Sequence, residues 1–385
     1  MQSQSPPIQS RDIATDRLFL LAIFAVQGIV AAMMFTRVPD IQLAAGLSEG
    51  QLGMVLMGAP VGGMTTFAIA TKLIERFGTR AIILGSYPLM ALAAPLLTVS
   101  INPAAMFAVL FVFGAMNSAG NIAINVEADR FEAASGSRIM NRCHGLWSVV
   151  FFFASLGGGL IRGAGVATEL HLWAMVPLFC IASLTIAVPM RSFPPRVTAG
   201  KPNRFVLPTL AVLALVAFGL GAELLEGASR VWATIYIRDV FEVPAVVESA
   251  ALPALILSMA VARLVADGII DRFGPQRVAS TALGIAIVGL CVVVFANNAY
   301  LAIVGFGIAG LGASVIYPLM ISAAARLGDR PASENVAALT MVVQLLLLVS
   351  PAIIGAVAEG LGVRVAFGLL LPLLAIGLIM SRMLK

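Results

Sequence analysis

Charged residues are scarce in this chain. Only 11% of its 385 residues are Asp, Glu, Lys or Arg, against about a quarter in soluble globular domains. Lysine occurs at only three positions, Lys72, Lys201 and Lys385. Because no run of Lys and Arg could follow a phosphate backbone, the net charge of +5 does not indicate nucleic-acid binding. We therefore expect no nucleic-acid partner.

Histidine and cysteine are few as well. The two histidines, His144 and His171, exclude a His-rich metal site, and the three cysteines lack metal-ligand or disulfide spacing. Glycine-rich stretches occur, but none is followed by the Lys-Ser/Thr pair of a P-loop. No Ser/His/Asp, HExxH or paired-acid set is present either. The sequence therefore predicts no metal, no cofactor and no enzyme active site.

Apolar residues make up 60% of the chain, and the mean hydropathy is +1.01. A helix needs about 20 predominantly apolar residues to cross a bilayer. Charges, Pro/Gly clusters and Asn pairs divide the sequence into twelve such segments. They are 18–38, 51–74, 80–100, 103–127, 141–164, 170–190, 206–236, 247–270, 277–296, 299–326, 333–357 and 362–382. The predicted fold class is an all-α membrane protein with twelve transmembrane helices in a lipid bilayer.

The longest linker lies at mid-chain and separates six helices from six more. The predicted division is a cytoplasmic tail at 1–17, an N-terminal bundle at 18–190, a cytoplasmic linker at 191–205 and a C-terminal bundle at 206–385. The tail shows no signal-peptide cleavage pattern. One side of the membrane would hold eighteen Lys and Arg residues and the other side four, which are Arg37, Arg162, Arg238 and Arg364. Because cytoplasmic loops carry the excess of positive charge, we expect both termini in the cytoplasm.

The two halves repeat a loop sequence. Glu75-Arg76-Phe77-Gly78 recurs as Asp271-Arg272-Phe273-Gly274, 196 residues later (271 − 75 = 196) and six predicted helices further on. Parallel six-helix repeats form one of the known transporter plans, with the substrate site at the bilayer midplane between the halves. The repeat therefore predicts two pseudo-symmetric six-helix bundles.

This loop resembles the motif G-x-x-x-D-R-x-G-R-[RK] of the major facilitator superfamily. Thr71 stands in place of the first Gly of the motif, Glu75 replaces its Asp, and Asp267 occupies the equivalent Gly position of the second half. In that family the loop latches the cytoplasmic side. The resemblance thus implies a gating role for Glu75, Arg76, Asp271 and Arg272.

Further segments are similar to a bacterial subgroup that includes YbjJ-like and fucose-permease-like proteins. The segments are Arg37-Val-Pro39-Asp40-Ile, Gly46 to Gly53, Asn125-Val-Glu127, Arg138 to Met140, His144 to Ser148, Glu226-Gly227 with Trp232, and Arg263 with Asp267. The resemblance implies secondary transport of a small molecule by alternating access. It also implies a monomer in the bacterial cytoplasmic (inner) membrane.

Charged residues inside a bilayer are costly and often functional. Glu223, Glu226 and Arg230 are three and four residues apart, hence on one helical face. Pairing of Glu226 with Arg230 would leave Glu223 less compensated, so these residues are the candidates for proton coupling. The alternative is a structural ion cluster at the outer end of the helix, near Trp232 and Tyr236.

Polar residues recur on the opposite half of the predicted cavity. The offset of 196 makes Gln27 the equivalent of Glu223, and Asn117, Asn121 and Asn125 follow one another every four residues. Amides suit hydroxyl or amide ligands, but Asn also joins membrane helices to one another. The predicted substrate-binding residues are Gln27, Asn117, Asn121, Trp232 and Gln344.

Two other charged groups lie near the cytoplasmic side. Glu127, Arg130, Arg142 and His144 are predicted to cluster there, with His144 as a second proton site and Glu127 and Arg142 in the gate. A solvated helix-end network is the alternative. Arg263 and Asp267 form a predicted i, i+4 pair that serves gating or packing.

The leading hypothesis is proton-coupled symport of a small polar metabolite, with a small-molecule substrate and protons as partners. The alternative is a proton-coupled antiporter that exports drugs or organic cations. Gly157 to Gly159 provide only half of the helix 5 antiporter motif because the expected Pro is missing. A sensor would usually add a soluble domain or a long tail, and we expect neither.

Overall fold

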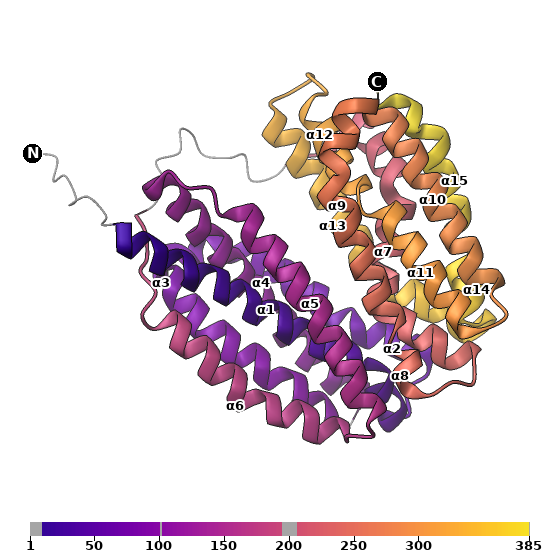
Figure 1. Cartoon of the computed structure of the whole chain (residues 1–385), viewed down its shortest axis with the longest axis horizontal. Coiled ribbons are helices and arrows are strands. Elements are labelled where there is room, and N and C mark those ends of the chain that lie inside the picture. Colours follow the sequence, from indigo (N-terminus) through magenta and orange to yellow (C-terminus); the bar gives the residue numbers. More distant parts are fainter. Residues whose placement is uncertain (1–9, 101, 195–205, 385) are drawn as a thin grey trace, which may run out of the picture.

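The computed structural model describes residues 10–100, 102–194 and 206–384 (Figure 1). Within these ranges every regular element is a helix. The predicted tail 1–17 and linker 191–205 are therefore described only in part, and Lys201, Arg204 and Lys385 lie outside the described residues. The first half contains α1 Ser10–Ala45, α2 Glu49–Leu56, α3 Gly58–Leu96, η1 Leu97–Val99, α4 Pro103–Ser135, α5 Met140–Gly163 and α6 Thr168–Ala187.

The second half has more labelled helices because several of its spans are interrupted. It contains α7 Leu210–Val240, α8 Ala245–Glu248, α9 Ala251–Phe273, α10 Pro275–Phe295, α11 Ala299–Ala313, α12 Ile316–Ala325, α13 Ala332–Leu361, α14 Val363–Gly368, α15 Leu370–Met380 and η2 Ser381–Met383. Together α8 and α9 make one span, as do α11 and α12, and α14, α15 and η2. The helix α3 in turn contributes to two spans, because its chain turns at Gly78.

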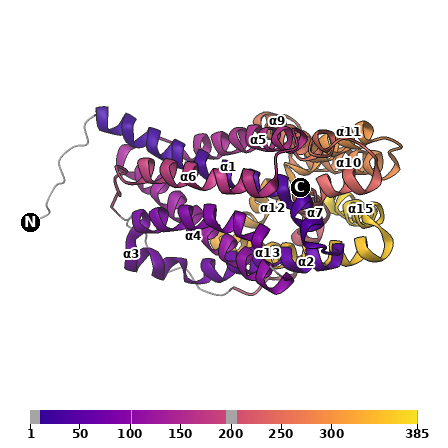
Figure 2. The same cartoon turned by 90° about the horizontal axis from the view of Figure 1, so that it is seen from below.

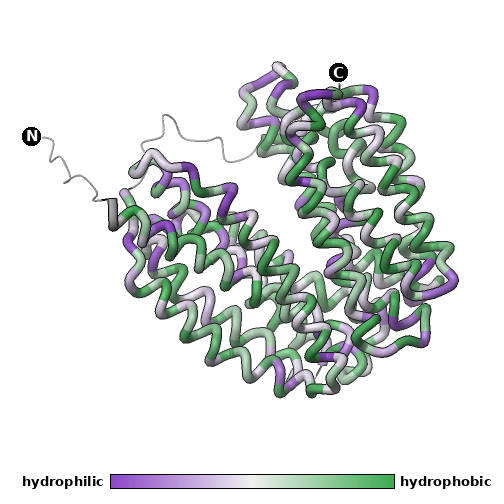
Figure 3. Tube along the Cα trace, in the orientation of Figure 1, coloured by the Kyte–Doolittle hydropathy of each residue, from purple (hydrophilic) through white to green (hydrophobic). Residues whose placement is uncertain are grey.

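The described residues provide twelve helices that are long and apolar enough to cross a membrane. The predicted number of spans is thereby confirmed, and the chain is a multi-pass membrane protein. Several spans are longer than predicted: the first runs from Ile13 to Ala45 and continues through Pro39. Hydrophobic residues follow the lengths of the helices, and hydrophilic residues gather at helix ends and at a few interior positions (Figure 3).

The repeat is visible in the backbone itself. Gly78 has φ 76° and ψ 157°, and Gly274, 196 residues later, has φ 81° and ψ 155°. Only glycine adopts such a conformation without strain. The side chains of Asn102 and Asn298 are also 196 residues apart, and each accepts a hydrogen bond at 2.9 Å from a backbone N–H three residues on, capping α4 and α11. The two halves therefore share turns and caps at one constant offset.

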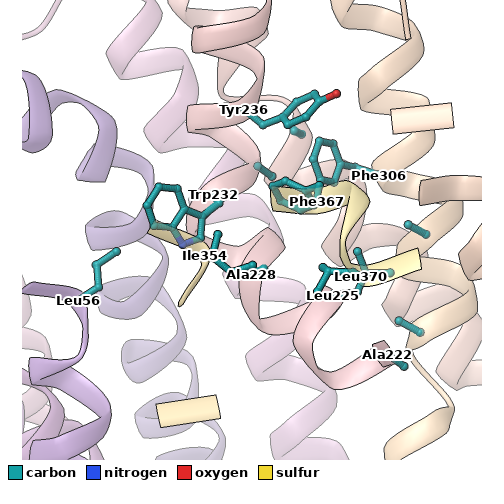
Figure 4. Packing of buried hydrophobic residues seen from close by; sticks show 14 of the residues in the cluster. Leu56, Ala222, Leu225, Ala228, Trp232, Tyr236, Phe306, Ile354, Phe367 and Leu370 are labelled. Atoms are coloured by element: carbon teal, nitrogen blue, oxygen red, sulfur yellow. The ribbon is translucent and has the colours of Figure 1, made fainter. Parts of the chain in front are cut away.

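The helices form two bundles, α1 to α6 and α7 to α15, which diverge toward one end (Figure 1). That end holds the first and last described residues, and we call it the open end. The bundles meet at the opposite, closed end, near α2 and α8. Figure 2 shows the same helices from below. Within the second bundle the rings of Tyr236, Phe306 and Phe367 pack edge to face at 5.4 to 5.6 Å, and the Tyr236 hydroxyl donates to Val293 O at 2.6 Å (Figure 4). This packing ties α7 to α10, α11 and α14 as one body.

Candidate functional site

Glycines bring the two bundles together at the closed end. A Cβ on Gly53 of α2 would lie 2.4 Å from the Pro351 carbonyl oxygen of α13, and one on Gly159 of α5 would lie 2.8 Å from Ser249 Cβ. The two contacts are equivalent by the repeat, because Gly159 corresponds to Gly355 and Gly53 to Ser249. Gly355 itself approaches the Glu49 carbonyl, where a Cβ would lie at 2.4 Å. Each bundle thus presents small residues that allow the other to come close.

An ion cluster reinforces only one of these two interfaces. The Arg162 guanidinium on α5 donates from Nε to Asp40 Oδ1 at 2.7 Å, and its Nη1 lies 2.6 Å from Glu248 Oε2 in the other bundle. Its Nη1 also donates to Ala245 O at 3.1 Å. The side chain of Arg162 is only 6% exposed. Its repeat equivalent is Ala358, whose side chain cannot form an ion pair.

The closed end also contains the pseudo-twofold axis of the repeat. Arg238 of α7 donates from Nη2 to Gln42 Oε1 at 2.9 Å and from Nη1 to Pro39 O at 3.1 Å. Gln42 and Arg238 are 196 residues apart, so they are equivalent positions of the two halves. Equivalent residues can touch only beside the axis that relates them. We call Arg37, Asp40, Arg162, Arg238 and Glu248 the closed-end cluster; its first two members pair at 3.0 Å.

The loop residues predicted for the cytoplasmic gate lie at the open end, and the side chains of Glu75, Arg76, Asp271 and Arg272 are exposed. The Arg76 guanidinium lies over the Phe77 ring at 5.3 Å, and Arg272 repeats the contact with Phe273 at 5.2 Å. Among the described residues, no ion pair or hydrogen bond joins Glu75 or Asp271 to the opposite bundle. The contacts that join the bundles are instead those of the closed end. The sequence predicts no role for Arg162 and Arg238 beyond the orientation of the chain, and Arg37 also belongs to a segment of family resemblance.

A cluster of four charged side chains lies along α7 and α9. Glu226 accepts through Oε1 from Arg230 Nη2, which confirms the predicted pair. Its second oxygen, Oε2, lies 3.5 Å from Arg263 Nη2, and Arg263 Nε donates to Ser314 O of the loop after α11 at 3.2 Å. The predicted pairing of Arg263 with Asp267 is therefore wrong. Arg263 reaches across to α7, and Asp267 is exposed on α9.

Glu223 completes this charged cluster and is its most buried member. The residue is 8% exposed, and its Oε1 has no hydrogen-bond partner among the described residues. Glu226, Arg230 and Arg263 are the charges that act on it. Trp232, two turns further along α7, is 1% exposed and packs beside Ile354 in the hydrophobic core (Figure 4). It therefore presents almost no surface to a substrate in this conformation.

Polar side chains of α1, α4 and α5 form a continuous chain of hydrogen bonds, which we call the amide ladder. Gln27 Nε2 donates to Asn117 Oδ1 at 3.1 Å, and Asn121 Nδ2 donates to Gln27 Oε1 at 3.4 Å. Asn125 Nδ2 then donates to Asn121 O at 2.8 Å, and His144 Nε2 lies 3.1 Å from Asn125 Oδ1. The residues predicted on separate grounds as substrate contacts and as a proton site are thus one network.

Glu127 does not belong to this network, and the predicted cluster with Arg142 and His144 is wrong. Glu127 is fully buried and accepts from Thr79 Oγ1 and from Phe193 N, each at 2.5 Å. Arg130 lies 3.9 Å away. Thr79 belongs to α3, and Phe193 belongs to the segment after α6, which folds back to Glu127 of α4. Arg142 is exposed on α5.

Comparisons with known proteins bear on the family. A family model described as Major Facilitator Superfamily matches residues 231–385. An uncharacterized MFS-type transporter of Yersinia pestis is 27% identical over 374 residues, which are 95% of this chain and 94% of that protein. The second half of the chain is thus similar to the major facilitator superfamily, and nearly the whole chain is similar to a protein named as an MFS-type transporter. This similarity is in keeping with the expectation that the chain is not an enzyme.

Solved structures of transporters share the fold. The nucleoside transporter NupG aligns with a TM-score of 0.74 at 13% identity and covers 96% of this chain and 98% of its own. The Escherichia coli fucose:proton symporter FucP aligns with a TM-score of 0.57 at 15% identity, with the same coverage of 96% and 98%. These similarities confirm the twelve-helix fold in two six-helix bundles.

Two further features lie beside the charged cluster. Gln344 is exposed on α13, one turn before Leu347, whose Cδ2 would lie 3.2 Å from a Cβ on Gly227 of α7. Gln344 therefore lies near the charged stretch of α7. A groove of about 620 Å³ between α9, α10 and α11 has a mostly apolar lining that includes Val265, Ile269 and Phe273. Its lining contains none of the four cluster residues, so we do not place the substrate site there.

Proposed function

We propose that this protein is a secondary active transporter that moves a small polar metabolite across the bacterial cytoplasmic membrane by proton-coupled symport. The observation that carries the proposal is the cluster of Glu223, Glu226, Arg230 and Arg263 within membrane-spanning helices. Ionisable groups in that environment typically belong to substrate or proton pathways. The amide ladder of the first bundle supplies polar partners for the substrate.

Alternating access follows from the way in which the bundles are joined. Their contacts lie at the closed end, where ion pairs, glycine packing and a buried apolar cluster that includes Phe151 of α5 and Ile256 of α9 would separate and re-form. The excess of Lys and Arg predicts that the open end faces the cytoplasm. On this proposal the structure is an inward-facing state, both termini are cytoplasmic, and the protein works as a monomer.

Glu223 and Glu226 are the proposed proton carriers. A buried carboxylate oxygen without a hydrogen-bond donor has little to stabilise its negative charge, and Glu223 Oε1 is such an atom. Glu226 has one arginine partner on its own helix, Arg230, and one on α9, Arg263, so movement of α9 relative to α7 would change its contact with Arg263. A proton on one of these carboxylates would therefore be linked to the arrangement of α7 and α9.

The geometry of the charged cluster does not favour export of organic cations. A cationic drug would need an accessible carboxylate. Both oxygens of Glu226 already accept from arginines, and the Oε1 of Glu223 is buried. Symport is therefore the better-supported mode. The relative FucP is a fucose:proton symporter by name, which agrees with this choice.

The proposal can be tested in liposomes that contain the protein and an internal pH-sensitive dye. Sugars, amino acids, nucleosides, organic acids and cationic drugs are added in turn at fixed external pH. We expect one polar class to start inward proton flux. Glu226→Gln should abolish gradient-driven accumulation but spare exchange of labelled substrate, whereas Glu169→Gln, an exposed carboxylate on α6, should change neither. Outward proton flux with cationic drugs would instead establish antiport, and equal loss of both activities in Glu226→Gln would remove the proton role.

A further inference from the structure

We infer that the substrate is an organic monoanion, a hydroxylated carboxylic acid whose carboxylate binds between Arg230 and Arg263. This inference rests on the proposed transport function and narrows its substrate class. It follows from the hydrogen-bonding groups that the charged cluster leaves available.

The charged cluster offers donors. A guanidinium group has five N–H donors, so Arg230 and Arg263 have ten between them. Three hydrogen bonds use them: one from Arg230 to Glu226, and two from Arg263, to Glu226 and Ser314 O. The side chains of Arg230 and Arg263 are 28% and 44% exposed. Both therefore have unused N–H groups that a ligand can reach.

Acceptors are less available in this cluster. Glu226 is 14% exposed, and each of its oxygens already accepts from an arginine. Glu223 Oε1 is buried. A ligand that approaches α7 and α9 thus meets cationic donors first. Arginine binds planar carboxylates through two parallel hydrogen bonds, so a carboxylate fits this surface better than an amine or a neutral sugar does.

Charge balance selects a monoanion and links it to the proton. With all four side chains ionised, the two arginines and two glutamates cancel. Glu226 and Arg230 on α7 and Arg263 on α9 are the charged groups that act on Glu223. A proton on Glu223 leaves the cluster at +1, and one carboxylate restores neutrality. A doubly charged phosphate ester would leave it at −1, an unfavourable charge inside a membrane.

The first bundle supplies partners for the hydroxyl groups of the substrate. The Nδ2 of Asn117 makes no hydrogen bond among the described residues, although its Oδ1 accepts from Gln27. It is the free end of the amide ladder, and His144 is the other end. An amide N–H₂ donates well to a hydroxyl oxygen. A substrate with an acid group and hydroxyl groups would therefore contact both bundles, as alternating access requires.

Binding is tested first, with the purified protein and thermal unfolding as the readout. The probes are gluconate, glucuronate and lactate, and the comparison compounds without a carboxylate are sorbitol, glucose, glucosamine and glucose 6-phosphate. We expect the carboxylates alone to raise the melting temperature. Arg230→Gln or Arg263→Gln should weaken their binding roughly ten- to hundredfold, while Arg277→Gln, outside the cluster, should not. The inference would be overturned if none of the three acids raised the melting temperature. It would also be overturned if glucose, glucosamine or glucose 6-phosphate raised the melting temperature as much as the acids do.

Transport then separates this inference from the function on which it rests. An acidic exterior should drive uptake of labelled gluconate into liposomes. Because H⁺ and a monoanion carry no net charge together, a potassium diffusion potential of either sign should leave the rate unchanged. Proton-driven uptake of a neutral sugar instead of an acid would refute the substrate class and leave symport standing. Binding of acids without proton flux would refute proton coupling and leave the carboxylate site standing.

Discussion

The ionised side chains of α7 and α9 are unequal in their surroundings, and this inequality assigns them different roles. Glu226 is held between Arg230 and Arg263, whereas Glu223 has a buried oxygen with no donor beside it. Removal of one partner from a buried ion pair leaves an uncompensated charge and is strongly destabilising. Removal of a charge that has no close partner carries no such cost. The two glutamates can therefore be told apart by experiment.

We predict that Glu223→Gln and Glu226→Gln differ in stability. The Glu226 variant leaves two arginines without their shared carboxylate, so its melting temperature should fall by several degrees. The Glu223 variant removes the less compensated carboxylate and should melt at or above the parent temperature, yet lose at least about tenfold in proton-driven uptake. Thermal unfolding of the purified variants and liposome uptake measure the two effects. A larger loss of stability in Glu223→Gln would contradict the assignment.

A second prediction concerns Gln27, the central member of the amide ladder. Gln27→Leu would leave the Asn117 and Asn121 amides without their shared partner, and an unsatisfied buried polar group costs about 1–3 kcal/mol. The variant should therefore melt at a lower temperature and also bind substrate more weakly. Ser148→Ala is the control, because that hydroxyl bonds only to its own helix, at His144 O. Equal melting temperatures of Gln27→Leu and Ser148→Ala would show that the amide ladder does not stabilise the first bundle.

Sequence reasoning identified residues whose partners are close in the sequence or related by the repeat. The pair of Glu226 with Arg230 followed from helical spacing. Gln27 followed from the offset of 196, and the asparagines followed from their four-residue spacing. Arg162 was missed because its partners Asp40 and Glu248 come from distant segments, one of them in the other bundle. Glu127 was misplaced for the same reason: the sequence does not reveal that Phe193 folds back over it.

At the scale of helices, glycine decides how closely the bundles approach. The α5 helix contains three consecutive glycines that face different surroundings. A Cβ on Gly158 or Gly159 would lie within 2.5 to 2.8 Å of Thr36 or Ser249, but one on Gly157 would meet nothing within 4 Å. The sequence predicted the glycine run and its general use in close helix packing. It could not show which of the three faces the other bundle, because that depends on the rotation of the helix.

This difference makes a matched pair of variants possible. In Gly159→Leu the new side chain would collide with Ser249, so the closed end could not form as it does here. We expect at least a tenfold loss of transport with little loss of folded protein, since the collision lies between bundles and not within one. Gly157→Leu introduces the same residue two positions away and should transport normally. Uptake assays measure the outcome, and size-exclusion chromatography of the detergent-solubilised variants shows that equal amounts of folded protein are compared. Similar losses of transport in both variants would mean that leucine disturbs α5 itself.

The whole molecule combines two bundles that share one architecture but differ in the chemistry that joins them. Turns at Gly78 and Gly274, caps at Asn102 and Asn298, and the contact of Gln42 with Arg238 all follow the offset of 196. The ion pairs of Arg162 break this symmetry, because Ala358 occupies the equivalent position. One interface therefore closes by packing alone, and the other closes by packing with charge. The charged interface is the one at which a single substitution should change the balance between open and closed states.

Arg162→Gln should shift that balance. The substitution removes the guanidinium that bridges Asp40 and Glu248. If this bridge stabilises the closed state by about 1.4 kcal/mol, its loss changes the ratio of open to closed states about tenfold. The reporter is a cysteine introduced at Ser249, which is 3% exposed in this state, in a background without native cysteines. With Arg162→Gln this cysteine should react roughly tenfold faster than with Arg162, when a membrane-impermeant maleimide is added at the closed end. Arg364→Gln is the matched control, since Arg364 bonds to Val294 O within its own bundle. Unchanged labelling in Arg162→Gln would mean that glycine packing alone keeps the end closed, and the asymmetry of charge would then need another explanation than gating.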